Sequence, residues 1–414
     1  MKSKNISAAS ILAAVIAGAA TGAFACGPFF PNTLLDAGDS AVLQPPSAGF
    51  EGELARMRLA PAKTRAVPPA EGQLLHEQAT ELEMSDLAAA LKRKKVSSEE
   101  ATVIMQAHLA ERMKLNVYLD QRHQWSSYRE WVYDTNGAAH LAEPTNPPPP
   151  FPPIAVTPGL PREFADYFAG AIAWHQDDTW TAQQSWERVL ALPEGERHFK
   201  SVWAAFMLAK YHERLTNDFG DGEAMKHLEQ VRSLAKAGFA DSSGLAVASM
   251  GDEARIYLRR KGYESAIGLY LDQYAAGDRT ALNSLRFTAA AALEETGATP
   301  EQLKSLAKNP RTQRVITAYL ISRHPYASAD GAATDPDAKR YFNGAVNWLK
   351  AVEAAQVKGV ESAEEFALAA YQAGDMEAAQ RWVNRAGGSA VARWLQAKLF
   401  LRAGKIDEAA GLLA

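Results

Sequence analysis

The chain has 414 residues, enough for two or three ordinary domains or for one extended array of repeats. Its formal net charge of -4 shows no surplus of positive charge, so nucleic acid is not predicted as a partner. The single cysteine, Cys26, excludes an intramolecular disulfide and a cysteine-cluster zinc or iron–sulfur site within one chain. Alanine is abundant and strand-like alternation is scarce, so the composition favours helices.

Residues 1–25 have the pattern of a secretory signal peptide. Lys2 and Lys4 precede an uncharged run from Ile6 to Ala25, which ends in a small–x–small cleavage pattern. At about 20 residues the run is long enough to span a membrane. It is only weakly hydrophobic, however, because it is rich in Gly and Ala, and no basic cluster follows it. We therefore predict export to the periplasm, to an outer-membrane anchor or out of the cell.

Cys26 directly follows the predicted cleavage site, and two interpretations of it stay open. In bacterial lipoproteins a cysteine at this position is lipidated, and lipidation here would tie the mature chain to a membrane. The segment resembles that lipobox only in part, because Phe24 is bulky where a small residue is usual and Ala23 replaces the usual Leu. The other interpretation is a soluble exported protein with Cys26 at its new N-terminus.

Residues 26–70 are predicted to be an irregular, proline-rich segment, in which Phe29 and Phe30 fill a hydrophobic groove of this chain or of a partner. Helical periodicity begins near Glu71 and indicates an N-terminal helical region over 71–140. Within it, Ser97 with Glu100 three residues later predicts a helix start through a capping box. The glutamates and His76 of residues 71–84 are interpreted as a solvated helix face. The basic run at 92–95 is interpreted as a helix C-terminus, where cations favour the dipole.

Residues 141–161 are predicted to be a proline-rich linker. Nine prolines occur between Pro144 and Pro161, four of them consecutive, and such a segment forms a stiff polyproline II helix. We interpret it as a spacer, with a docking peptide for an aromatic groove as the alternative.

A repeated spacing of small and bulky residues organises 162–414. In four units a small residue is followed by a second small residue twelve positions later and by a bulky residue sixteen positions later, starting from Gly170, Ala254, Ala367 and Ala397. A fifth unit is centred on Ala209, with three extra residues in its loop. Small residues let two antiparallel helices approach closely, and the bulky residue lies one turn further on the same face. Turn residues are predicted between the paired helices at Asp177-Asp178, Gly222, Gly262, Gly374-Asp375 and Gly404.

This spacing pattern resembles the tetratricopeptide repeat (TPR) over about 165–275 and 360–414. Leu192-Pro193 is similar to the family's inter-repeat ending. The sequence departs from the family pattern at Ala173 and Ala370, where an aromatic residue is usual. Between the two regions that resemble the repeat, over 279–356, the spacing fades while helix signals continue, such as the cap at Thr299. The resemblance implies an all-α chain whose helix–turn–helix repeats form an α-solenoid, with the first helices lining a concave face.

We find no specific catalytic signature, because the sequence has no HExxH, phosphate-binding glycine loop or GxSxG motif. We therefore lean against an enzyme and expect no cofactor and no metal. The prediction is an exported, non-catalytic scaffold or binding protein whose groove receives a protein, a peptide or a cell-envelope polymer. Trp174, His175 and Trp203 lie on predicted first helices and are the expected partner-binding residues.

Two alternatives stay open. The chain could be the substrate-guiding part of a cell-wall enzyme whose catalytic domain lies elsewhere. It could also be an envelope assembly factor anchored through a lipid on Cys26, which is the only membrane contact expected.

Overall fold

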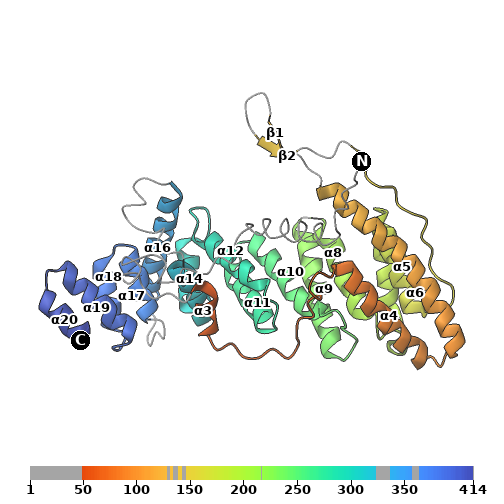
Figure 1. Cartoon of the computed structure of the whole chain (residues 1–414), viewed down its shortest axis with the longest axis horizontal. Coiled ribbons are helices and arrows are strands. Elements are labelled where there is room, and N and C mark those ends of the chain that lie inside the picture. The colour runs from red at the N-terminus through yellow and green to blue at the C-terminus, as the bar shows by residue number, and fades with distance from the viewer. Residues whose placement is uncertain are drawn as a thin grey trace, which may run out of the picture. The chain divides into compact units, whose positions relative to one another are not determined.

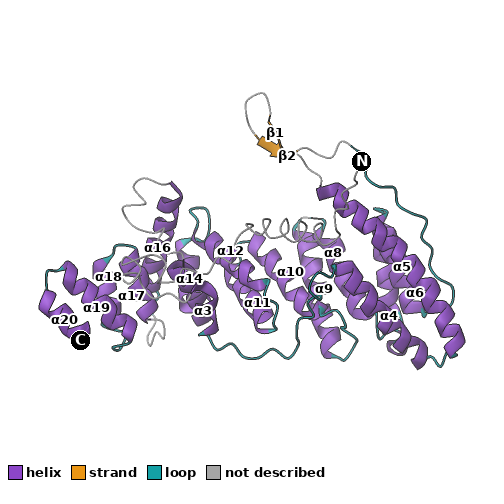
Figure 2. Cartoon of the chain, viewed as in Figure 1, coloured by secondary structure: helices purple, strands orange, loops and turns teal. Residues whose placement is uncertain are grey.

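The computed structural model describes residues 49–127, 131–133, 139–141, 146–215, 217–322, 336–356 and 363–413. These residues belong to a single unit of the chain, Ala48–Ala414. They form seventeen α-helices, one short 3₁₀ helix and one hairpin of two three-residue strands (Figures 1 and 2). The predicted all-α class is therefore confirmed. The predicted signal peptide, Cys26, Phe29 and Phe30 lie outside the described residues.

The helices are numbered in chain order, and most of them are labelled in Figure 1. Their bounds are α3 (Gly49–Ala55), α4 (Leu75–Arg93), α5 (Ser98–Ser127), α6 (Arg162–His175), α7 (Thr179–Ala191), α8 (Ser201–Glu213), α9 (Asp218–Lys236), α10 (Leu245–Arg259), α11 (Tyr263–Ala275), α12 (Ala281–Leu293), α13 (Pro300–Lys308), α14 (Pro310–Ser322), α16 (Pro336–Ala354), α17 (Ala363–Gln372), α18 (Met376–Val383), α19 (Ala390–Arg402) and α20 (Ile406–Leu413).

Each of the five predicted units is found as a packed pair of neighbouring helices: α6 with α7, α8 with α9, α10 with α11, α17 with α18, and α19 with α20. The small residues at the predicted contact positions are buried in every pair. In the first pair the reason is direct, because a Cβ atom on Gly170 would lie 2.5 Å from the indole nitrogen of Trp186. Glycine at this position therefore lets the Trp186 ring lie against the backbone of α6.

In four of the five pairs the described turn residues include one with positive φ, although it is not always the predicted one. Asp177, Gly374 and Gly404 have φ angles of 60°, 79° and 73° at their predicted turns, whereas in the α10–α11 turn Lys261, with a φ of 56°, takes this conformation in place of the predicted Gly262. The prediction for Gly222 is wrong, because it lies inside α9. The side chain of Asn217 accepts a hydrogen bond from the Gly220 N–H, which caps α9 early and turns the expected loop into a first helical turn.

The helices α4 and α5 pack against each other, and Phe164 and Phe168 of α6 pack against them. The Ser97 hydroxyl accepts the Glu100 N–H at 3.2 Å, as the predicted capping box requires. The basic run ends α4 as predicted, with Lys94 as C-cap. The region predicted as helical also contains the hairpin, in which β1 (Trp131–Tyr133) pairs antiparallel with β2 (Ala139–Leu141).

The proline-rich segment lies along α5 rather than apart from it. The Phe151 ring meets Tyr118 edge to face at 5.0 Å, and the Ala155 N–H donates to the Glu111 carboxylate at 3.0 Å. Nearer the N-terminus, the segment 26–70, which was predicted to be irregular, contains α3. This helix packs against α14 (Figure 1).

Candidate functional site

Trp174 and His175, two of the predicted partner-binding residues, lie in the last turn of α6 and are half-buried. The Arg214 guanidinium lies over the Trp174 ring, with its central carbon 3.6 Å from the ring centre. The Trp186 ring also packs on Trp174, with the two ring centres 5.6 Å apart. Trp174 is thus held between a cation and the core of the α6–α7 pair, which fixes its orientation.

The imidazole of His175 is uncharged at neutral pH. Burial, followed by the positive charges of Arg112, Arg122 and Arg214, lowers the pKa of His175 to about 4, and Asp177 opposes this only weakly. A neutral imidazole can exchange hydrogen bonds with a partner but offers no charge to it.

Trp203 does not join these two residues at the surface. Only 9% of it is exposed, and its ring packs edge to face on Tyr167 with ring centres 5.9 Å apart. The structure therefore places Trp203 in the core between α6 and α8, where its burial stabilises the fold.

A buried cluster of ionisable groups, centred on Glu83 of α4, is the strongest electrostatic feature that the sequence analysis missed. His108 Nε2 lies 2.7 Å from Glu83 Oε1, while Lys200 Nζ and Arg112 Nε lie 3.6 and 3.7 Å from Glu83 Oε2. We call these four residues the Glu83 cluster. Glu83 was interpreted as part of a solvated face, and that interpretation is wrong, since its side chain is 2% exposed.

Electrostatics keep the Glu83 carboxylate ionised. Burial alone would raise its pKa, but the charges of Lys200 and Arg112 and the hydrogen bond from His108 outweigh burial and hold the pKa of Glu83 well below its usual range. Burial in turn lowers the pKa of Lys200, and Glu83 opposes that shift.

The Lys200 ammonium is enclosed by aromatic rings as well as by Glu83. Its Nζ lies 4.9 Å from the ring centre of Phe164, 5.1 Å from that of Tyr167 and 5.0 Å from that of Trp203. Lys200 and His108 are both 0% exposed, so no substrate can reach these groups in this conformation. The Glu83 cluster joins α4 and α5 to α6 and to the start of α8, and its role is structural.

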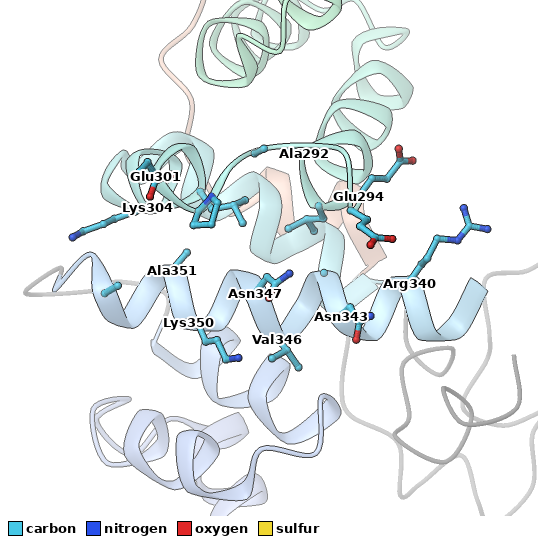
Figure 3. A pocket seen from close by; sticks show the side chains of 17 residues that line it. Ala292, Glu294, Glu301, Lys304, Arg340, Asn343, Val346, Asn347, Lys350 and Ala351 are labelled. Atoms are coloured by element: carbon cyan, nitrogen blue, oxygen red, sulfur yellow. The ribbon is translucent and has the colours of Figure 1, made fainter. Parts of the chain in front are cut away.

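An open cavity of about 860 Å³ is the better candidate for a binding site (Figure 3). It lies between α16 and the elbow formed by the end of α12 and by α13. The elbow is fixed by the capping box of α13, in which the Thr299 hydroxyl accepts the Gln302 N–H and the Gln302 side chain accepts the Thr299 N–H. Gly344 lets α16 approach closely, because a Cβ there would lie 2.8 Å from the Leu293 carbonyl oxygen.

The lining of this cavity combines apolar and polar side chains and is balanced in charge. Asn343 and Asn347 lie four residues apart on α16 and share one exposed helix face, as Figure 3 shows. Among the lining residues three acidic and three basic side chains are found, which are Glu294, Glu295, Glu301, Lys304, Arg340 and Lys350. Such walls favour a ligand that carries both donors and acceptors over a polyanion.

Within the described part of the chain no group of three or more His, Cys, Asp or Glu residues is arranged to hold a metal ion. No helix among the described residues is long and apolar enough to cross a membrane. No family model and no curated protein matches the chain.

Proposed function

We propose that this chain is an exported, TPR-like scaffold that binds an extended peptide segment of a partner protein in the cavity between α13 and α16. The repeated helix pairs with buried small residues support the scaffold, as successive pairs of this kind stack into an α-solenoid. The leader-like residues 1–25 support export.

The observation that carries the peptide proposal is the pair of carboxamides on α16. A peptide backbone presents an N–H donor and a C=O acceptor at nearly every residue, and a carboxamide offers both complementary groups. Asn343 and Asn347 are therefore placed to hold a backbone in register. The volume of about 860 Å³ falls within the usual range for ligand sites, which is roughly 300–1,000 Å³.

The test is to select binders from a random peptide display library with the full chain and to measure their affinities by calorimetry. In an Asn343→Ala/Asn347→Ala variant we expect the affinity to fall roughly tenfold or more, because two hydrogen bonds are lost. Asn283→Ala is the matched control, since Asn283 is exposed on α12 and does not line the cavity. Selected peptides that bind wild type and the double variant equally would place binding elsewhere.

Export and anchoring are tested separately by the mass of the mature chain. A chain that begins at an unmodified Cys26 would support a soluble exported protein, whereas a mass increased by acyl groups would support the lipid anchor. A mature chain that retains residues 1–25 would contradict export through a cleaved signal peptide.

A further inference from the structure

The two-turn helix α3 is held on a distant part of the chain by two apolar side chains. Phe50 and Leu54 lie four residues apart, so they share one face of α3, and they are 2% and 1% exposed. Both join the core that includes α14, the helix against which α3 packs. The Arg286 guanidinium also lies 5.3 Å from the Phe50 ring centre. α3 therefore docks as a short amphipathic helix lying on a surface built by other helices.

Polar attachments of this segment lie at the surface. Glu51 pairs with Arg279, whose side chain is largely exposed while that of Glu51 is partly exposed, so solvent screens the pair. Arg314 donates to the Arg56 carbonyl oxygen at 3.0 Å. The chain that follows, residues 57–67, has no helix or strand and alternates for most of its length between half-buried and exposed residues. The segment is attached by Met57 and Leu59, which pack against the core, and by the Ala66 N–H, which donates to the Ala276 carbonyl oxygen at 2.9 Å. Its release breaks these contacts but no hydrogen bond within a helix pair.

The buried face of α3 also places the Glu53 carboxylate near the carboxylate of Glu365. Glu53 and Glu365 of α17 line the same small void together with Arg314, and the Glu53 side chain is 5% exposed. Burial, followed by the charges of Glu364 and Glu53, raises the pKa of Glu365 to about 7, against the opposing effects of a hydrogen bond from its own backbone and of the Arg314 charge. Glu365 Oε2 has no hydrogen-bond partner. Because the shift is upward, docking is favoured while Glu365 is protonated and is weakened as the pH rises through about 7.

We propose that α3 is a releasable latch and that the surface beneath it on α14 binds an amphipathic helix of a partner protein. The present occupant defines the chemistry of that partner, which is a helix with an aromatic residue and a leucine four positions apart. This site goes beyond the proposed peptide cavity, because the two share no lining residue. Release of α3 uncovers the α14 surface, and a partner helix then replaces it.

The first test measures binding in trans. A fluorescein-labelled peptide with the sequence of residues 49–58 is added to the full chain and to its Phe50→Asp/Leu54→Asp variant, and binding is followed by anisotropy. We expect the variant to bind the peptide at least tenfold more tightly than wild type does, because in wild type the tethered α3 competes at an effective concentration of about 1 mM. The same two substitutions made in the peptide abolish binding. A variant with wild-type circular dichroism that does not bind the peptide would overturn the proposal.

The second test does not depend on the folding of the Phe50→Asp/Leu54→Asp variant. It changes Glu365 and leaves the apolar contacts of α3 intact. Hydrogen exchange of α3 is compared between wild type and Glu365→Gln at pH 5 and pH 8. At pH 8 we expect exchange in α3 to be at least tenfold slower in the variant, while at pH 5 the two chains agree once intrinsic rates are corrected. Equal protection at both pH values, or α3 amides as protected as those of α14 in wild type, would show that α3 is a fixed part of the core.

Discussion

The contact within the α6–α7 pair and the contact that joins α4 and α5 to α6 and α8 both bury side chains, but only the second encloses a cluster of charges. Between α6 and α7, Gly170 and Ala182 bring the helices together and Trp186 fills the remaining space. At the other contact the interior holds Glu83 and Lys200, which are 2% and 0% exposed. The centre of one interface is apolar, with the ion pair of Arg188 and Asp166 at its more exposed edge, whereas the other encloses a set of charges that depend on each other.

The difference predicts how each interface responds to damage. An apolar contact loses stability in proportion to the volume or area that changes, since its neighbours relax around the change. A buried ion network adds little net stability over an apolar core, but the loss of one member leaves its partners charged and without compensation. We therefore expect the Glu83 cluster to be the more fragile of the two.

The largest effect is expected for Glu83→Gln. This change keeps the shape but leaves Lys200 and Arg112 buried without their nearest counter-charge, which costs about 3–5 kcal/mol. Urea unfolding of the variant and wild type measures the difference. The control is Glu81→Gln, an exposed position on the same helix, where a change within about 0.5 kcal/mol is expected. A loss below about 1 kcal/mol at Glu83 would mean that water reaches the cluster.

The next largest effect is the stability regained when the charge of Lys200 is removed together with that of Glu83. We expect Glu83→Gln/Lys200→Met to be more stable than Glu83→Gln alone by about 2 kcal/mol, because methionine fills the aromatic enclosure of Lys200 without a charge. The double-mutant cycle from urea unfolding gives the coupling directly. Strictly additive losses would show that Glu83 and Lys200 contribute independently, and the network description would not hold.

The paired helices were predictable from sequence because their contact imposes a local rule. Gly170 or an alanine must stand where two backbones meet, and the spacing of twelve residues follows from two helices and one turn. The rule fails where a side chain offers the backbone another option. Asn217 caps α9 five residues before the predicted glycine, so the loop becomes helix and Gly222 lies within it.

The Glu83 cluster and the cavity were not predictable, because both depend on which helix faces are covered. His108, Arg112 and Asn116 recur every four residues on α5 and are buried, whereas Val103 and Met113 are exposed on the same helix. A sequence pattern gives the faces of a helix but not the one that the fold covers. The cavity needs α13 and α16 to meet across intervening helices, in a stretch where the repeat spacing fades.

A smaller effect tests the apolar side of the comparison. Gly170→Ala should destabilise the chain by about 1–3 kcal/mol, because the new Cβ forces the enclosed Trp186 ring to move. Gly268→Ala is the matched control, since Gly268 lies inside α11 and a Cβ added there would meet no atom within 4 Å. There alanine should stabilise the helix by up to about 1 kcal/mol. Thermal or urea unfolding measures both, and the same sign at both glycines would contradict a close contact at Gly170.

The smallest effect concerns the turns inside the helix pairs. Asp177 and Gly374 occupy the same place in their helix pairs, with φ angles of 60° and 79°. Because this conformation is unfavourable for residues with a Cβ, Asp177→Gly should stabilise the chain by up to about 1 kcal/mol and Gly374→Ala should destabilise it by about 1 kcal/mol. The contact of Asp177 with Arg214, at 4.0 Å and exposed, offers little to offset the gain. If Asp177→Gly were instead destabilising in urea unfolding, the exposed pair with Arg214 would contribute more than turn geometry does.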